Sequence, residues 1–309
     1  MRATRGAPVP EPAWPHAMHS ILWHNPFRSV RLERAPGRPI FIVALAVYVG
    51  INLSMVLTWD VVDGHVRDWD TWRALPTALA EGTLYALETE LPYPYSPLFA
   101  PVMAGIGIIG LIPWAAISCA SLLLLRDWRL IVLVVVSIGF WTNVAGGNTF
   151  TFVLVSAALA LAGSRRAAIV FLVLTMLMPR PVQLPIAAVL IWKMQDIRLP
   201  VAVIFLAQGV AVLLTGYADD WTGAVLAQTI PPWNLGPSRW IGGLWLPIGA
   251  VLGAFLWWRR RPGWAGLAFS SYWVPHYLLM PLAEQRYDTH TMSALAGLAV
   301  IQYAFAALQ

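Results

Sequence analysis

The sequence predicts an all-α polytopic membrane protein, and three observations lead to that class. Hydrophobic residues make up 59% of the 309 positions and charged residues only 11%, whereas soluble domains carry about 25% charged residues. Several apolar runs approach the roughly 20 residues that a helix needs to cross a bilayer. The 17 tryptophans are typical of anchors at the membrane interface. We therefore expect residues 39–309 to form one transmembrane domain.

A basic, proline-rich tail covers residues 1–38. It lacks the layout of a signal peptide, because the first apolar run begins only at Pro39. The stretch "HSILWHNPFRSVRLER" predicts a short amphipathic segment on the membrane surface. His16, His19 and His24 fit no standard pattern of metal ligands, so no metal site is predicted. The single Cys119 excludes an intramolecular disulfide.

Ten apolar segments are expected to cross the membrane. They are 39–59, 95–125, 130–142, 149–163, 167–179, 181–192, 199–216, 242–258, 264–282 and 290–307. As one helix, 95–125 would be about 46 Å long, against a hydrocarbon core of about 30 Å. Its prolines and glycines indicate that it is broken. It therefore crosses either twice or once, net, with a re-entrant part.

The distribution of arginine and lysine decides between these two paths, because cytoplasmic loops are enriched in both. With a cytoplasmic amino terminus and one net crossing by 95–125, 15 of the 20 basic residues lie inside and 5 outside. Two crossings would change the split to 9 inside and 11 outside. One net crossing gives ten crossings with both termini cytoplasmic, and we expect a bacterial cytoplasmic membrane. Topology then explains the net charge of +5, so no nucleic-acid partner is predicted.

Four unusual segments fall on the outer side in this topology: the acidic loop 60–94, the turn 143–148, "MPRP" at 178–181 and the loop 217–241. Only 14 residues, about 21 Å of helix, run from the cytoplasmic Arg166 to Pro179. Arg180 is therefore expected at membrane depth, where a charge is costly without a cavity or a partner. We favour an anion site there, such as one for a lipid phosphate. The alternative is an arginine that snorkels to the headgroups.

Residues 68–82 predict a short amphipathic helix on the outer surface, with its aromatic side chains in the membrane interface. Its apolar face contains Trp69, Trp72, Leu75, Leu79 and Gly82. Pro76 counts against a regular helix through its middle. Asp68 and Asp70 stand at its start, where a carboxylate serves as an N-cap or favours the helix dipole. A carboxylate base beside the membrane is the other interpretation, and the residues alone leave both open.

A series of short motifs begins in this helix. The stretch "DWDTWRALPTALAEGTLY" places an aspartate, an aromatic residue four positions later, a glycine and a Leu-Tyr pair in order, at Asp68, Trp72, Gly82 and Tyr85. "YPYSP" follows at Tyr93 and leads into the next membrane segment. "GGNTFTFVLVSAALAL" then carries a turn at Asn148 before an apolar helix, and "LMPRPVQLP" carries Arg180 and Gln183.

Taken in order, these motifs resemble those of glycosyltransferase family 87, which are polyprenyl-phosphate-sugar-dependent enzymes of the C-type glycosyltransferase superfamily. The family has a Tyr-Pro-Pro-type entry, a Gly-Asn or Gly-Gln turn and a Lys-Pro-Gln segment in the corresponding places. The resemblance covers roughly residues 40–195. Each motif is weak alone, and the shared order carries the resemblance. Arg180 stands where lysine is usual, the chain is short for the family, and the loop 217–241 is small.

The resemblance implies a C-type fold and a hexosyltransferase that moves a sugar from a polyprenyl-phosphate donor to an extracytoplasmic acceptor. Asp68 would be the base that takes the proton of the acceptor hydroxyl. Arg180 would bind the donor phosphate and stabilise it as it leaves. The remaining site-lining residues would be Asp70, Trp72, Tyr85, Tyr93, Asn148, Gln183 and His276. No cofactor or metal ion is expected besides the donor substrate and membrane lipids.

Other functional classes stay open. An inactive family member, or a non-catalytic subunit that scaffolds partner proteins in a larger membrane complex, would use the same fold. A lipid or solute transporter is disfavoured, because the two halves show no inverted repeat. His276 lies within an apolar run and is either a site residue or a hydrogen-bonded histidine between helices. The enzyme interpretation predicts that Asp68, Asn148 and Arg180 meet around one outward-facing site, with Asp70 pointing about 200° away from Asp68 on a regular helix.

Overall fold

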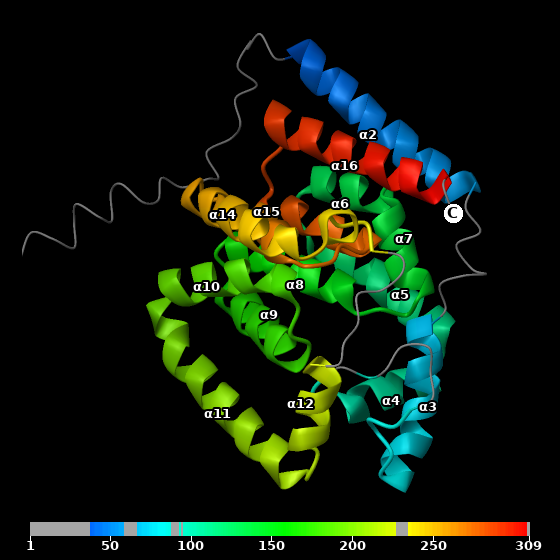
Figure 1. Cartoon of the computed structure of the whole chain (residues 1–309), viewed down its shortest axis with the longest axis vertical. Coiled ribbons are helices and arrows are strands. Elements are labelled where there is room, and N and C mark those ends of the chain that lie inside the picture. Colours follow the sequence, from blue (N-terminus) through cyan, green and yellow to red (C-terminus); the bar gives the residue numbers. More distant parts are fainter. Residues whose placement is uncertain (1–37, 59–66, 88–92, 94, 227–233, 308–309) are drawn as a thin grey trace, which may run out of the picture. The chain divides into compact units, whose positions relative to one another are not determined.

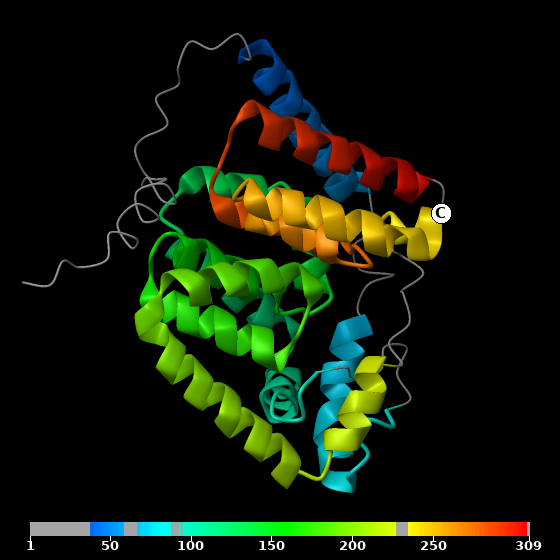
Figure 2. The ribbon, with the colours of Figure 1, turned by 60° about the vertical axis from the view of Figure 1, so that its left-hand side comes forward.

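The computed structural model describes residues 38–58, 67–87, 93, 95–226 and 234–307 (Figures 1 and 2). Within these ranges every regular element is a helix, which confirms the all-α class. Three helices are long and apolar enough to cross a membrane, or five if each bent pair counts as one span. The tail with its three histidines and parts of the loops 60–94 and 217–241 lie outside the described residues.

Two hydrogen bonds join the first described helix, α2 (Arg38–Thr58), to α6 (Trp128–Val135) and α7 (Ile138–Ala145). The hydroxyl of Tyr48 donates to the carbonyl of Leu133 at 3.0 Å, and Asn52 accepts from the backbone N–H of Ile138 at 3.1 Å. The pair α6–α7 is bent by 71°, and Ser137 caps the start of α7. Tyr48 precedes Asn52 in the sequence, and their partners Leu133 and Ile138 follow in the same order. Helix α2 therefore runs in the same direction as α6 and α7.

Helix α3 (Arg67–Glu81) is continuous through Pro76, as the predicted helix at 68–82 requires. Its surroundings differ from those expected. Trp69, Trp72 and Leu75 are buried in the protein core instead of facing the membrane interface. They pack near α4 (Ala100–Ile109), which contacts α3 closely. Hydropathy alone could not separate a protein-facing from a lipid-facing aromatic stripe, because both present the same pattern.

Helices α4 and α5 (Leu111–Ser121) form a broken segment bent by 110° at Gly110, whose φ of +104° favours glycine. The 3₁₀ turn η1 (Leu122–Leu124) follows. Trp114 in α5 donates to the carbonyl of Gly147 at 2.9 Å. Beyond η1, Asp127 accepts from the hydroxyl of Tyr287 at 2.8 Å. The segment is thus broken, as its prolines and glycines predict, and it is either a bent span or a re-entrant loop.

The centre of the core is α8 (Phe150–Leu161), with α9 (Arg165–Leu177) packed against it. The 3₁₀ turn η2 (Pro181–Gln183) leads into α10 (Leu184–Lys193), so that 178–183 is the tip of a short hairpin. Next come η3 (Gln195–Ile197), the long α11 (Arg198–Leu214) and α12 (Ala218–Leu226). The last part contains α13 (Ser238–Ile241), η4 (Gly242–Leu244), α14 (Trp245–Trp258), α15 (Pro262–Phe269), η5 (Pro275–Glu284) and α16 (Thr289–Ala307).

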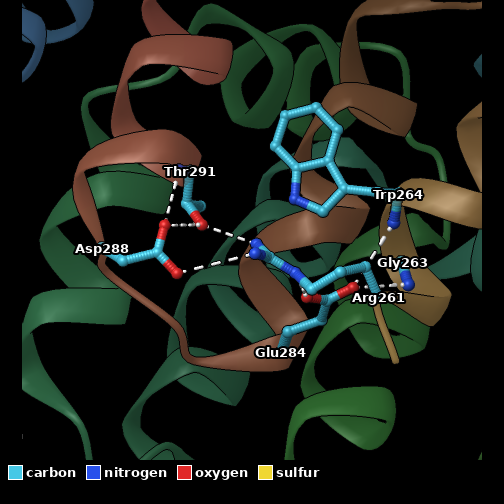
Figure 3. Close-up of polar contacts among 6 residues, drawn as sticks. All are labelled: Arg261, Gly263, Trp264, Glu284, Asp288 and Thr291. Atoms are coloured by element: carbon cyan, nitrogen blue, oxygen red, sulfur yellow. Dashed lines mark hydrogen bonds and ion pairs between the residues drawn. The ribbon is translucent and has the colours of Figure 1, made fainter. Parts of the chain in front are cut away.

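The crossing expected at 264–282 is wrong, because α15 and η5 form a hairpin whose two ends meet (Figure 3). Arg261, just before α15, pairs with Glu284 at 2.6 Å and with Asp288 at 3.5 Å. Glu284 also accepts from the backbone N–H groups of Gly263 and Trp264, at 2.8 and 3.4 Å. The apolar length of the segment suggested a span, but length carries no information about a reversal of direction.

This hairpin also changes the direction of α16. Thr291, at its start, contacts Arg261 at 2.5 Å, whereas Phe305, near its end, lies under the guanidinium of Arg239 at 4.6 Å. Arg239 precedes α14 and Arg261 follows it, so α14 and α16 are antiparallel. Helices α2 and α16 run in the same direction in both views (Figures 1 and 2). The start of α2 and the end of α16 thus lie at opposite ends of the bundle, whereas ten crossings would bring them to the same end.

Candidate functional site

The turn between α7 and α8 is fixed by two tryptophans. The indole N–H groups of Trp72 and Trp114 both donate to the carbonyl of Gly147, at 3.0 and 2.9 Å. Gly147 has a φ of +69°, and an added Cβ would lie 2.7 Å from the ring of Trp69. Only glycine fits this position without strain. The next residue, Asn148, is thereby held in one place by helices α3 and α5.

Asn148 links the two charged residues that were expected to meet. Its side-chain amide donates to the carboxylate of Asp68 at 2.6 Å. Its carbonyl oxygen accepts from Nη2 of Arg180 at 3.3 Å and from the backbone N–H of Phe150 at 3.1 Å. Asn148 is 4% exposed. These bonds confirm that Asp68, Asn148 and Arg180 come together, although 112 positions separate the first from the last in the sequence.

Arg180 lies in the protein interior at the hairpin tip. Pro179 ends α9 before it and Pro181 starts η2 after it, so its backbone is extended, with φ −128° and ψ 132°. It is 4% exposed, and therefore the snorkelling interpretation is wrong. Its Nη2 also donates to the hydroxyl of Tyr95 at 2.9 Å. Three rings surround the guanidinium, at 5.5 to 5.9 Å from its carbon: Tyr95, Phe150 and Tyr277.

Several polar atoms at this tip lack a partner among the described residues. Nη1 of Arg180 is buried and makes no hydrogen bond. The same holds for both polar atoms of the Gln183 side-chain amide. Leaving a buried polar group unpaired costs about 1–3 kcal/mol, and more for a charged group. The unpaired atoms therefore mark a place where a polar or anionic ligand would find donors and an acceptor already positioned.

Asp68 and Asp70 have different surroundings. Burial raises the pKa of Asp68 above its ordinary value, while the hydrogen bond from Asn148 and the charge of Arg180 lower it and leave a net rise. Asp68 keeps part of its surface accessible, and Asn148 stands between it and Arg180. Asp70 is exposed. The two carboxylates thus point to different places, as the helical register predicts.

The predicted lining residues Trp72, Tyr85 and Tyr93 lie behind the site instead of in it. Trp72 and Tyr93 are 2% and 1% exposed, and their rings pack on Tyr95 at 5.9 and 5.6 Å. Tyr85 donates to the backbone carbonyl of Tyr95 at 2.8 Å. They support Tyr95, which sequence reasoning did not single out. The available signal was its place as the second tyrosine of "YPYSP".

His276 reaches the site from the hairpin of α15 and η5. Its ring lies 5.1 Å from the rings of both Phe150 and Tyr277. These ring contacts place His276 beside the site, and both interpretations of this residue, as a site residue and as a hydrogen-bonded histidine between helices, stay open. Tyr277, whose hydroxyl lies 3.1 Å from that of Tyr272, was missed. The sequence placed both residues in a crossing helix, and only the hairpin brings them to Arg180.

Close backbone contacts hold this hairpin against the site. An added Cβ at Gly266 in α15 would clash with the carbonyl oxygen of Val182, two residues after Arg180. An added Cβ at Gly139 in α7 would clash with that of Pro275. Glycine allows helices to approach this closely. The positions of η2 and η5 around the guanidinium therefore depend on two glycines from other elements.

Comparisons of this chain with models of protein families, with curated proteins and with solved structures find no match. Within the described part of the chain, no group of three His, Cys, Asp or Glu side chains could hold a metal ion. The chemistry of the site therefore supplies the argument for function. It combines a buried cation with a free N–H, a carboxylate with a raised pKa, and an amide that separates them.

Proposed function

We propose that this chain is a membrane glycosyltransferase that moves a sugar from a polyprenyl-phosphate donor to an acceptor hydroxyl on the outer side of the membrane. One observation supports this most directly. Arg180 is buried with its Nη1 group unpaired, and a single amide, that of Asn148, separates it from Asp68. An anion-binding group and a carboxylate base thus stand close together without neutralising each other, and the order of motifs resembles glycosyltransferase family 87.

Arg180 would bind the phosphate of the donor. A guanidinium offers several N–H donors in a fixed plane that fits phosphate oxygens, and charge-assisted hydrogen bonds are about twice as strong as neutral ones. The surrounding rings of Tyr95, Phe150 and Tyr277 exclude water, which strengthens the interaction. During transfer the bond between the anomeric carbon and the phosphate oxygen breaks, and the phosphate leaves with the electron pair. Arg180 stabilises the charge that develops there.

Asp68 would act as the base. The acceptor oxygen forms the new bond to the anomeric carbon, with inversion, and its proton passes to the carboxylate. A direct ion pair with Arg180 would lower the basicity of that carboxylate and occupy the guanidinium. Asn148 satisfies both groups through an uncharged amide instead. The Asn148 turn is pinned by the indoles of Trp72 and Trp114, so the spacing does not depend on a mobile loop.

The corrected path of the chain supports one orientation in a bacterial cytoplasmic membrane. We propose nine net crossings: α2, α5 with η1, α6 with α7, α8, α9, α10, α11, α14 and α16. Arg286 then joins Arg261 on the inner side, and 16 of the 20 basic residues lie inside, against 15 for ten crossings. The positive-inside rule thus favours the hairpin. The tail before α2 is cytoplasmic, and the end of α16 and the site face outward.

A binding measurement tests the proposal. Purified protein in detergent is titrated with a short-chain polyprenyl phosphate, and Arg180→Gln is compared with Arg73→Gln, a change at an exposed arginine of α3. Loss of a charge-assisted hydrogen bond is expected to weaken binding about 10- to 100-fold in Arg180→Gln, while Arg73→Gln binds as wild type does. Equal binding by both variants, or none by the wild type, would favour a non-catalytic scaffold.

A further inference from the structure

Gln183 is buried completely, with 0% of its surface exposed. Neither its Nε2 nor its Oε1 has a hydrogen-bond partner among the described residues. A buried amide without partners loses the hydrogen bonds that it would make with water, and this loss destabilises the folded protein. The side chain therefore requires a group that can both donate and accept.

The 3₁₀ turn η2 keeps Gln183 close to Arg180 along the backbone of the hairpin tip. The backbone N–H of Gln183 donates to the carbonyl of Arg180 at 3.0 Å, which closes one 3₁₀ turn. The unpaired Nη1 of Arg180 and the unpaired amide of Gln183 thus belong to the same short hairpin tip, 178–183.

The three unpaired atoms indicate which hydrogen-bonding groups a ligand of this site must carry. Nη1 of Arg180 requires an acceptor, preferably an anionic oxygen. Nε2 of Gln183 also requires an acceptor, but Oε1 requires a donor. A phosphate ester with ionised oxygens only accepts, so it would leave Oε1 unpaired. A hydroxyl group accepts and donates, and it would satisfy both atoms of the amide.

We infer that Gln183 binds a hydroxyl group of the donor's sugar, next to the phosphate that Arg180 holds. This inference rests on the proposed function and assigns Gln183 to recognition of the sugar. A site built to hydrogen-bond a hydroxyl discriminates strongly against ligands that lack it, because its own polar atoms then stay unpaired. Gln183 thus selects the glycosylated carrier over the bare carrier phosphate.

The rigidity of the turn makes this selection effective. Pro181 precedes Gln183 in η2, and Pro185 follows it at the start of α10. The backbone of Val182 lies directly against Gly266 of α15. These contacts fix the backbone that carries Gln183, and complete burial restricts its side chain, so its amide is preorganised for the hydroxyl.

The test compares two carriers on two variants. The affinity of the purified full chain is measured for a polyprenyl phosphate and for the same carrier bearing one sugar. Gln183→Met keeps the size of the side chain and removes its polar atoms. Gln302→Met is the matched control, because Gln302 in α16 is 4% exposed and its Nε2 is also buried without a partner.

We expect Gln183→Met to bind the bare carrier as wild type does and the glycosylated carrier about tenfold more weakly. Gln302→Met should match wild type with both. Unchanged affinity of Gln183→Met for both carriers, or an equal loss for both, would overturn the assignment to the sugar. Failure of the wild type to bind even the bare carrier would overturn the proposed function as well. If Gln183→Met does not fold, Gln183→Asn, which withdraws the amide by about 1.5 Å, is expected to show the same selective loss.

Discussion

Asn148 keeps a carboxylate and a guanidinium apart in the protein interior. Charges this deep normally pair, because the desolvation of each is repaid only by a close partner. Here the amide donates to Asp68 and accepts from Arg180, so both groups are satisfied in part and both keep capacity for a substrate. The unpaired Nη1 of Arg180 shows most clearly that the guanidinium can still form hydrogen bonds with a substrate.

Replacement of this amide tests the spacer directly. In Asn148→Ala, Asp68 and Arg180 are expected to pair with each other, because both lose the partner that separates them. Affinity for a polyprenyl phosphate should then fall about tenfold, the cost of one charge-assisted hydrogen bond. The measurement is carrier binding, with the unfolding temperature recorded to show that the variant is folded. A folded Asn148→Ala that binds the carrier as wild type does would refute the spacer role.

The pH dependence of transfer follows from Asp68. Burial raises the pKa of its carboxyl above the ordinary value, although the bond from Asn148 and the charge of Arg180 oppose the rise. A base works only when deprotonated, so kcat/KM should fall as pH drops through this raised pKa, with a midpoint above the ordinary aspartate value of about 3.9. Asp70→Asn, at an exposed position, should leave the midpoint unchanged. A rate that stays constant down to pH 4 would contradict the assignment.

At the scale of elements, the hairpin of α15 and η5 is closed by a buried ion pair (Figure 3). The side chains of Arg261 and Glu284 are 16% and 3% exposed, whereas those of the pair between Arg165 and Asp196 are 74% and 45% exposed. Removal of Glu284 leaves the largely buried Arg261 with only the half-exposed Asp288 as a charged partner, and it also removes the acceptor of the Gly263 and Trp264 N–H groups. Removal of Asp196 leaves a solvated charge. The first pair is therefore expected to carry far more of the stability.

Unfolding measurements on two variants check this difference. Glu284→Ala should destabilise the protein by about 3–5 kcal/mol, the usual cost of breaking a buried pair. Asp196→Ala should cost no more than about 1 kcal/mol, as for surface pairs. The two are compared by thermal unfolding in the same detergent. Equal unfolding temperatures for both variants would show that the hairpin does not depend on this pair.

The contact between α15 and η2 makes a second prediction for the same hairpin. Gly266→Ala introduces a Cβ that clashes with the carbonyl of Val182, so η2 must shift together with Arg180 and Gln183. Carrier affinity should fall at least about tenfold, since interiors this closely packed transmit small displacements. Gly297→Ala in α16 is the control, because nothing lies within 4 Å of its added Cβ. Equal affinities in the two variants would mean that η2 does not depend on α15.

At the scale of the whole molecule, the proposed path of nine crossings puts the carboxyl end on the outer side of the membrane. Arg239 meets Phe305 at one end of α14, and Arg261 meets Thr291 at the other. A reporter fused after Gln309 distinguishes the two sides: alkaline phosphatase is active only outside, and a green fluorescent protein fluoresces only inside. We expect high phosphatase activity and little fluorescence. The opposite result would restore an even number of crossings.

The sequence predicts the helical class, the helix at 68–82 and the meeting of Asp68, Asn148 and Arg180. Those follow from local periodicity and from the order of short motifs. It does not predict the hairpin, because apolar length is the same in a crossing and in a reversal. Tyr95 and Tyr277 were missed for a related reason: which ring faces Arg180 depends on packing between distant elements, and no local pattern records it.

The central claim is transfer from a polyprenyl-phosphate donor with Asp68 as the base. The most direct test is transfer of labelled sugar from such a donor in membranes that contain wild type, Asp68→Asn or Asp70→Asn. We predict transfer by the wild type and by Asp70→Asn, and a loss of about 10²–10⁴-fold in Asp68→Asn, the usual range for removal of a general base. Equal transfer by Asp68→Asn and the wild type, or no transfer by the wild type from any such donor, would contradict the account.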